Sequence, residues 1–200
     1  MSLVNHKFWI FDMDGTLTMA IHDFEAIRQE LGITSGTPIL EAMAAMPEDE
    51  ARECGRRLHD LEMELAHQAM PQPGVFEVLD SLVQKDCRFG ILTRNDEDIA
   101  LATLEAAGLA GYFEEASIVG RETCAPKPLP DGVHHLLNLW DAPKNQTVMV
   151  GDYLYDIQAG FEAGVTTVHF DHTGNFPWPE YTHYRVERIS GLVQLVNPDR

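Results

Sequence analysis

Cysteine, basic side chains and long apolar runs are all scarce in this chain of 200 residues. The three cysteines, Cys54, Cys87 and Cys124, are an odd and widely scattered set, which favours free thiols in a reducing compartment over disulfides or a zinc site. No apolar stretch approaches the ~20 residues that span a bilayer, and the apolar run in MSLVNHKFWIF is too short for a secretion signal. We therefore expect a soluble protein of the cytoplasm that has no membrane partner.

The chain also has few basic residues: it contains 14 Lys and Arg against 32 Asp and Glu, which gives a net charge of −18. A surface this acidic repels DNA, RNA and anionic lipid, so we expect no nucleic-acid partner. It also repels a phosphorylated metabolite at long range. Any anion site therefore needs a local positive group, which a metal ion, a lysine or a helix N-terminus can supply.

Apolar residues are plentiful, at 44% of the chain, which is enough for a real hydrophobic core in one domain. Short, nearly continuous apolar runs are typical of parallel strands covered on both faces, and they occur at residues 8–11, 89–92, 116–119, 147–150 and 166–170. Helical stripes lie between these runs, with Gly108 predicted as a helix stop and Asp131 as an N-cap. The alternation predicts an α/β fold with a doubly wound, Rossmann-like parallel sheet.

Residues 18–72 interrupt this alternation, because they contain helical patterns and no credible strand. One helix is expected from Asp23 to Gly32, a second with Thr37 as its N-cap before Pro38, and a third from Pro47 to Met70. A segment of about 55 residues is marginal as an independent fold. We therefore predict a helical cap of residues 18–72 inserted into an α/β hydrolase core of residues 1–17 and 73–200.

Polar side chains follow four of the predicted strands. They are Asp12 and Asp14 after the first strand, Thr93, Arg94 and Asn95 after the second, Lys127 beyond the third, and Asp152 and Asp156 after the fourth. The carboxyl ends of parallel strands meet at one edge of the sheet, so these side chains should converge there. Adjacent carboxylates at the end of a buried strand repel each other and lose water, which calls for a cation beside them. We expect a divalent cation with an anionic substrate on its far side.

Each of these residues or motifs, taken alone, has an explanation that involves no functional site. The stretch DMDG resembles the opening of a calcium loop, but its glycine comes too early and a strand precedes it instead of a helix. Lys127 alone would be read as a surface lysine, Thr93 as a strand-end hydroxyl, and GDYLYD as a turn before a helix. Their shared placement just after predicted strands favours a single site.

In its motifs the chain resembles the haloacid dehalogenase superfamily. The resemblance is to the branch that carries a helical cap after the first strand and includes phosphoglycolate phosphatases and β-phosphoglucomutases. The resemblance rests on DMDGT, on the LT of ILTRN, on the PKP around Lys127 and on GDYLYDIQAGFEAGV, and it covers nearly the whole chain. Many relatives have an acidic residue and a serine after GTL, whereas this chain continues TMAIHD. No substrate can therefore be carried over from the resemblance.

The resemblance implies a role for each matching residue. Asp12 is the nucleophile that forms an aspartyl-phosphate, and Asp14 is the general acid and base. Mg²⁺ is held by Asp12, the backbone carbonyl of Asp14, and Asp152. Asp156 is a further ligand or a partner that orients Lys127, which neutralises phosphate charge. Thr93 and the backbone N–H groups near Arg94 and Asn95 bind the phosphoryl oxygens.

These roles predict a Mg²⁺-dependent phosphatase that acts on a small phosphorylated metabolite. Dehalogenases of the superfamily lack an aspartate two residues after the nucleophile, so Asp14 favours phosphate ester chemistry. A phosphomutase of the β-phosphoglucomutase kind and a non-catalytic binding protein are the alternatives. In the cap, His22, Arg28, Arg52 and Arg56 are candidates for substrate contact, although a solvated helix face also explains the last two. We expect a monomer or a small homo-oligomer.

Overall fold

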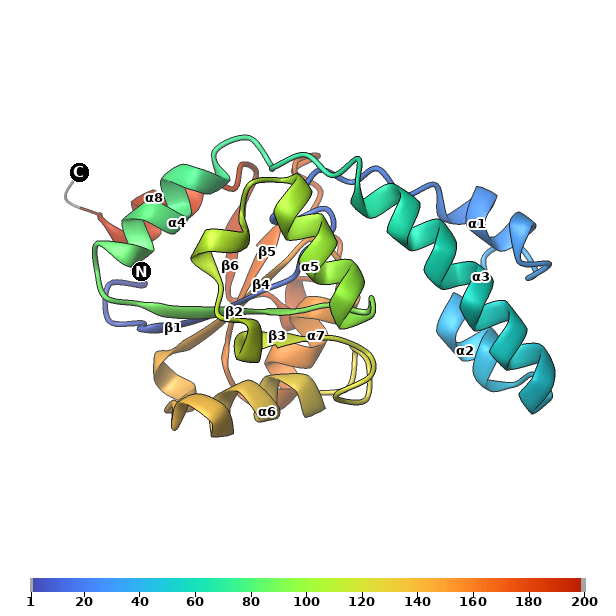
Figure 1. Cartoon of the computed structure of the whole chain (residues 1–200). Helices are drawn as coiled ribbons and strands as arrows, with labels where there is room; N and C mark the ends of the chain where they lie inside the picture. Colours follow the sequence, from blue (N-terminus) through green and yellow to red (C-terminus); the bar gives the residue numbers. More distant parts are fainter. Residues whose placement is uncertain (1, 199–200) are drawn as a thin grey trace.

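The computed structural model describes residues 2–198 and contains one parallel sheet of six strands in the order β3-β2-β1-β4-β5-β6 (Figure 1). The strands are β1 (Phe8–Phe11), β2 (Arg88–Leu92), β3 (Ile118–Val119), β4 (Thr147–Gly151), β5 (Thr166–Phe170) and β6 (Tyr184–Val186). The central strand β1 pairs in register with β2 and β4, so that Phe11 lies beside Ile91 and Val150. The predicted doubly wound α/β fold is confirmed.

Helices cover both faces of this sheet (Figure 1). On one face lie α4 (Val75–Val83), α5 (Glu97–Ala106) and α8 (Gly191–Val196), and on the other α6 (Asp131–Trp140) and α7 (Leu154–Ala163). Buried residues such as Trp9 and Leu79 form the core under the first face, while Ile10 and Leu136 belong to the core under the second. Alternate residues of β1 therefore face opposite layers, which explains why the strand is apolar throughout.

Several element ends differ from their sequence-based expectation. Strand β6 is additional to the expected strands, because it lies at the sheet edge and its short sequence, with the exposed Arg185 before the buried Val186, shows no apolar run. Asp131 is not an N-cap, since Pro130 occupies that position and Asp131 is the first helical residue. In α2 (Ile39–Ala44), Pro38 likewise holds the N-cap position in place of Thr37, with no side-chain capping bond. Pro38 has the extended backbone conformation that precedes a helix, since its ring fixes φ near −60°. The N-cap of α2 therefore lies one residue later than expected.

Between β1 and α4 the chain forms a helical insert, which we define as residues 18–72. It contains α1 (Phe24–Glu30), α2 and α3 (Glu48–Ala66), and its helices project beyond the carboxyl ends of the strands (Figure 1). Asp23 caps α1 by accepting hydrogen bonds from the N–H groups of Glu25 and Ala26, as its position predicts. Helix α3 ends at Ala66 and not at Met70.

The insert has a small apolar core of its own, centred on Ile27, Leu31 and Leu58. Its two connections to the sheet domain run side by side, because Thr18 forms a bridge with Pro71 and the N–H of Met19 donates to Met70 O at 2.9 Å. The paired connections place the insert over the end of β1. In residues 2–198, no helix is both long and apolar enough to cross a membrane.

Candidate active site

Lys127 is a buried cation held between two carboxylates at the carboxyl edge of the sheet. Its Nζ lies 2.5 Å from Oδ1 of Asp12, just after β1, and 2.6 Å from Oδ1 of Asp156, in the first turn of α7. The lysine is 2% exposed. Burial disfavours its charge, but the two carboxylates outweigh this and raise the pKa of Lys127 overall. The lysine therefore stays positive and fixes the positions of both carboxylates.

The carboxylates outnumber this one cation. Oxygen atoms of Asp12, Asp152 and Asp156 lie within 4.8 Å of one another. Burial, reinforced by the charge of Asp156, raises the pKa of Asp152 to about 7. Burial and the same neighbour also raise the pKa of Asp12, with Lys127 opposing them. The cluster is short of positive charge, and oxygen donors of this kind suit Mg²⁺.

Asp156 has a specific place in this cluster, because both of its oxygens are occupied. Oδ1 faces Lys127, and Oδ2 accepts a hydrogen bond from the N–H of Tyr153 at 3.0 Å, which caps α7. Asp152 differs, because within residues 2–198 its carboxylate accepts a side-chain hydrogen bond only from Thr16 Oγ1, at 3.2 Å to Oδ1. The arrangement favours Asp156 as the residue that orients Lys127, and Asp152 as the one directed at a metal ion.

Gly15 makes room for Asp152. Its φ is +91°, a left-handed conformation, and a Cβ built there would stand 2.5 Å from Oδ2 of Asp152. Only glycine satisfies both conditions. This explains the glycine of the DMDG sequence, since the loop after β1 must turn tightly while approaching the loop after β4.

Asp14 is separated from Lys127 and has its own partner. Nδ2 of Asn95 donates to Oδ2 of Asp14 at 2.8 Å, and Nδ1 of His22 lies 3.8 Å from Oδ1. Burial raises the pKa of Asp14, while His22 and Asn95 act against this shift. A buried carboxyl with a raised pKa can hold a proton and give it to a neighbouring group.

The loop after β2 brings Thr93, Arg94 and Asn95 to the same edge, but their side chains face different partners. Thr93 is buried, and its Oγ1 accepts a hydrogen bond from the N–H of Asn95 at 3.1 Å. The guanidinium of Arg94 instead donates to both carboxylate oxygens of Glu41 on α2, at 2.9 and 3.0 Å, and lies over the ring of Tyr155. Arg94 therefore joins the core to the helical insert.

Between the insert and the core lies a cleft of about 440 Å³, and Asp12, Asp14, Asp152 and Lys127 line its floor. Its opposite wall comes from the insert and is mainly apolar, with contributions from Phe24, Ile39, Leu40 and Leu58. The converging residues predicted from the four strand ends thus share one cleft.

Similarity to known proteins identifies the family of the chain. The model of the haloacid dehalogenase-like hydrolase family matches residues 9–170. The chain belongs to this family. A haloacid dehalogenase-like hydrolase domain-containing protein of Arabidopsis thaliana is 33% identical over 208 residues, covering 94% of this chain and 82% of its own length. The pyrophosphatase PpaX of Listeria innocua is 26% identical over 95% of this chain and 96% of its own.

Solved structures show the same fold. The crystal structure of a hydrolase from Pseudomonas syringae superposes with a TM-score of 0.79 and 22% identity, and the match covers 97% of this chain and 98% of that one. The family model and the curated relatives identify the chain as a haloacid dehalogenase-like hydrolase with phosphatase-like relatives, and the solved structure shows the same fold. The resemblance seen in the four sequence motifs is confirmed at the level of family and fold.

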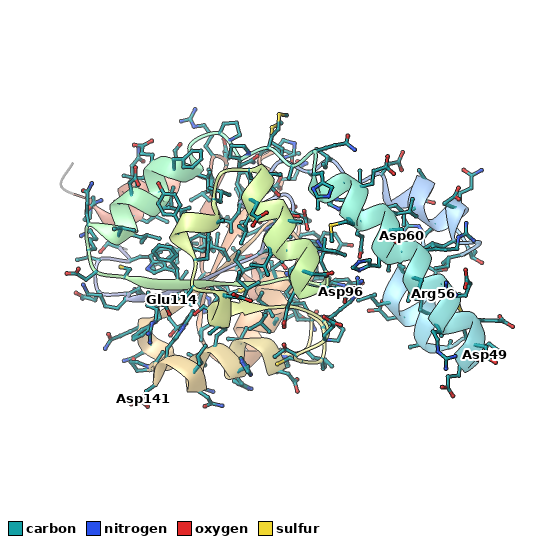
Figure 2. The ribbon with its side chains drawn as sticks, in the orientation of Figure 1. Asp49, Arg56, Asp60, Asp96, Glu114 and Asp141 are labelled. Atoms are coloured by element: carbon teal, nitrogen blue, oxygen red, sulfur yellow. The ribbon has the colours of Figure 1, made fainter. Side chains whose placement is uncertain are left out.

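The four candidates for substrate contact in the insert of this hydrolase occupy different places. Arg28 lines the cleft, and the His22 side chain, which is 8% exposed, lies beside Asp14. Arg52 and Arg56, in contrast, do not line it. Their side chains are 62% and 69% exposed and pair with acidic neighbours on α3. Figure 2 shows Arg56 on this helix. The structure thus separates them from the cleft, because they lie on the solvent face of the helix.

Two charged cleft residues of the hydrolase were missed in the sequence. Glu62 on α3 and Arg121, which follows β3, form an ion pair at 3.0 Å across the cleft between insert and core. Burial raises the pKa of Glu62 to about 7, against the pull of Arg121. A signal for Glu62 exists, since it continues the buried stripe of Cys54 and Leu58 at four-residue steps. Arg121 has no comparable signal.

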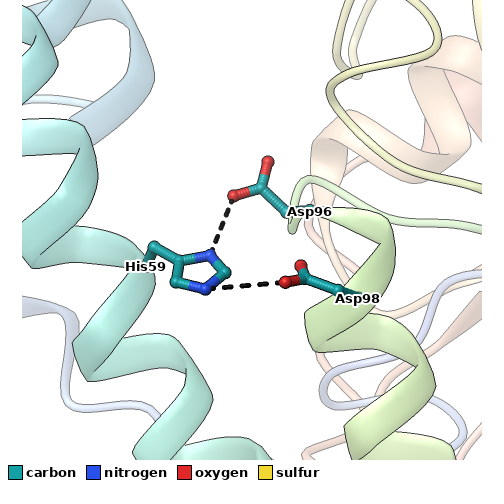
Figure 3. A group of neighbouring side chains, drawn as sticks. All are labelled: His59, Asp96 and Asp98. Atoms are coloured by element: carbon teal, nitrogen blue, oxygen red, sulfur yellow. Dashed lines mark ion pairs between the residues drawn. The ribbon is translucent and has the colours of Figure 1, made fainter.

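A further contact joins α3 to the start of α5 (Figure 3). Nδ1 of His59 lies 3.5 Å from Asp96, and Nε2 lies 3.5 Å from Asp98. Asp96 also accepts a hydrogen bond from Arg121. Because the two ring nitrogens face different carboxylates, the arrangement is typical of an ion-paired contact between insert and core.

Proposed function

We propose that this hydrolase is a Mg²⁺-dependent phosphatase, which cleaves a small phosphomonoester through an aspartyl-phosphate on Asp12. The observation that carries the proposal is the placement of Lys127 against Asp12, with Asp14 held separately by Asn95 in the same cleft. Lys127 thus favours the ionised form of Asp12 against the effect of burial, whereas burial favours a proton on Asp14. A nucleophile and a general acid need these two environments.

The donor set fits Mg²⁺. Asp12, Asp152 and the backbone carbonyl of Asp14 would hold the ion, and their crowded negative charge has only Lys127 to balance it within the cluster. When bound, the ion neutralises phosphoryl oxygens and reduces the repulsion between the phosphate and Asp12.

In the first step, an Oδ of Asp12 attacks phosphorus while the bond from phosphorus to the ester oxygen breaks. Asp14 gives its proton to that leaving oxygen, so the product departs as a neutral alcohol. Lys127 remains protonated beside Asp12 and stabilises the charge that spreads over the phosphoryl oxygens. Thr93 Oγ and the neighbouring backbone N–H groups position those oxygens.

In the second step, the carboxylate of Asp14 removes a proton from water, and the water oxygen attacks phosphorus. The bond between phosphorus and Asp12 breaks, which releases inorganic phosphate and restores the aspartate. Asn95 orients Asp14 for both transfers through its hydrogen bond. Both carboxylates end in their starting protonation states.

The cleft supports a small substrate. The helical insert acts as a cap over the carboxylates, and the cleft beneath it has a volume of about 440 Å³, which suits a metabolite better than a phosphoprotein or a nucleic acid. A phosphomutase would in addition have to bind a second phosphate group. Among the described residues that line the cleft, every arginine already has a carboxylate partner, which favours hydrolysis.

Replacement of the nucleophile tests the proposal. Asp12→Asn keeps the size of the side chain but removes the attacking charge. Its turnover of p-nitrophenyl phosphate should fall by several orders of magnitude, on the order of 10⁴-fold. Asp60→Asn, on the exposed face of α3, is the matched control and should retain full activity. More than a tenth of the original activity in Asp12→Asn would refute the mechanism.

The metal requirement is tested separately. Excess EDTA should abolish turnover, and added Mg²⁺ should restore it. Free phosphate and free alcohol should form in equal amounts from a sugar phosphate, whereas an isomeric sugar phosphate as product would show a mutase. Full activity in EDTA would refute magnesium dependence.

A further inference from the structure

The peptide group between Asp152 and Tyr153 is held by a side chain at each of its polar atoms. The carbonyl oxygen of Asp152 accepts a hydrogen bond from Nε2 of His169 at 3.3 Å, and the N–H of Tyr153 donates to Oδ2 of Asp156 at 3.0 Å. A peptide group is planar, so bonds at both atoms restrain its rotation. The direction in which the Asp152 side chain leaves the backbone is restrained with it.

His169 reaches this peptide group from the end of β5. In the parallel pairing of β4 with β5 it lies beside Gly151, the residue before Asp152. Its neighbours Val168 and Phe170 belong to the core under α4, α5 and α8, so the alternation of the strand turns His169 to the other face, which carries α7. Strand register therefore sets the position of His169.

The imidazole of His169 has one polar contact among the described residues, and this is the bond to Asp152. The side chain is 1% exposed, and burial lowers its pKa, which keeps the ring neutral. A carbonyl oxygen only accepts, so the hydrogen is on Nε2, and the buried Nδ1 is left without a partner in residues 2–198. An unpaired buried nitrogen is unfavourable, and an apolar side chain would avoid it. The bond to Asp152 is what a histidine contributes at this position.

An aromatic side chain packs against this histidine. Trp178, in the loop after β5, stacks on the ring of His169 with the centroids 5.2 Å apart, and it packs edge-on against Tyr153 at the same separation. Contacts of this kind favour one orientation of the rings. The indole therefore supports both the donor and the residue that follows Asp152.

We propose that His169 is a positioning residue for the metal site: by holding the carbonyl group of Asp152, it keeps the carboxylate of Asp152 directed at Mg²⁺. The inference rests on the Mg²⁺ site of the proposed function and adds a residue that lies behind the cleft and is not among those that line it. Hydrogen bonds that orient metal ligands commonly change metal affinity by about ten- to a hundredfold.

Two substitutions separate the hydrogen bond of His169 from the volume of its ring. His169→Leu removes the donor, and the Kd of Mg²⁺, measured by titration calorimetry on the metal-free protein, should rise by about tenfold or more. His169→Gln keeps an N–H donor and should recover most of the affinity. His172→Leu, at an exposed position in the loop after β5, is the control and should bind Mg²⁺ as the unmodified protein does. An unchanged Kd in His169→Leu, or equal losses in His169→Leu and His169→Gln, would overturn the proposal.

Melting temperatures distinguish positioning from simple packing. If His169 only fills space, His169→Leu should lower the melting temperature and leave the Kd of the folded protein unchanged. If it positions Asp152, the melting temperature without metal should change little, since leucine also removes the unpaired Nδ1. Added Mg²⁺ should then stabilise His169→Leu less than it stabilises the unmodified protein.

A measurement on the unmodified protein tests the proposal even if His169→Leu unfolds. Long-range proton–nitrogen NMR spectra of isotope-labelled histidine distinguish the two neutral tautomers. We expect the Nε2–H tautomer for His169 and a change in its Nε2 resonance when Mg²⁺ binds. The Nδ1–H tautomer, or no response to Mg²⁺, would contradict the assigned role.

The metal site and the role of His169 fail in different ways. If the unmodified protein binds no Mg²⁺ and keeps its activity in EDTA, the metal site of the proposed function is wrong and the role of His169 falls with it. If Mg²⁺ binds and is required, but His169→Leu binds it equally well, only the inference on His169 is wrong.

Discussion

Asn95 donates a hydrogen bond from Nδ2 to Oδ2 of Asp14 at 2.8 Å, across a sequence separation of 81 residues. The contact joins the loop after β2 to the loop after β1. It is a direct consequence of the parallel pairing of these neighbouring strands, which places both loops at one edge of the sheet. Asn95 therefore orients the proposed general acid and base.

Removing this hydrogen bond should affect catalysis more than binding. Asn95→Ala leaves Asp14 free to rotate, and we expect kcat for p-nitrophenyl phosphate to fall by about tenfold or more with a smaller change in KM. Asn138→Ala, an exposed site on α6, is the control and should leave both constants unchanged. A rise in KM with unchanged kcat would contradict an orienting role.

Magnesium affinity should depend on pH through Asp152. Burial and the nearby Asp156 raise the pKa of its carboxyl from 3.8 to about 7, so the metal-free protein holds a proton there below neutral pH. Mg²⁺ needs the ionised form, and its apparent affinity should fall about tenfold between pH 8 and pH 6. Titration calorimetry in buffers of different ionisation enthalpy measures both the affinity and the released proton.

The raised pKa of Asp152 also predicts how the stability of the folded protein depends on pH. The unfolded chain releases this proton near pH 3.8, and the folded chain holds it up to about pH 7. The raised pKa therefore destabilises the metal-free protein as pH rises through this interval, and Mg²⁺ should raise the melting temperature more at pH 8 than at pH 6. A pH-independent Mg²⁺ effect would contradict the role of Asp152.

Gly15→Ala should damage the metal site. The added Cβ would lie 2.5 Å from Oδ2 of Asp152, so that carboxylate has to move and magnesium affinity should fall by more than tenfold. Gly32→Ala is a matched control, because Gly32 also has positive φ but an added Cβ there would have no atom within 4 Å. Both variants should lose about 1 kcal/mol of stability from backbone strain. Equal magnesium affinities would contradict the prediction.

Substitutions in the insert should separate cleft residues from surface residues. Arg28→Ala removes a long side chain from the cleft wall, so kcat/KM should change unequally across esters with leaving groups of different size. Arg56→Ala, at a side chain that is 69% exposed, should leave the ranking of esters unchanged. Steady-state kinetics on one ester panel decides between these outcomes, and identical profiles for both variants would contradict the cleft geometry.

Much of the sheet domain follows from sequence. The apolar runs predict five of its strands, and the third shortens to two residues because Glu115–Ser117 forms a helical turn. The edge strand β6 escapes detection because its three residues include the exposed Arg185. The convergence of Asp12, Lys127 and Asp152 also follows, since parallel topology brings every strand end to one edge whatever the sequence distance.

The charge pairs of the cleft depend on tertiary structure. Sequence places Arg94 in the loop after β2, but its partner Glu41 belongs to the insert and is defined only by how α2 packs against that loop. Arg52 and Arg56 look equally suited to bind an anion, yet the rotation of α3 turns them to solvent and buries Glu62.

The α/β fold, the family, and the carboxylates and lysine at the strand ends can thus be recognised from the amino-acid sequence alone. These features depend on local periodicity and on a topology that always gathers strand ends together. The ion pairs between the insert and the core are visible only in the folded chain. Glu62 and Arg121, for example, belong to segments that are far apart in the sequence, and no local sequence pattern encodes how these segments lie relative to each other.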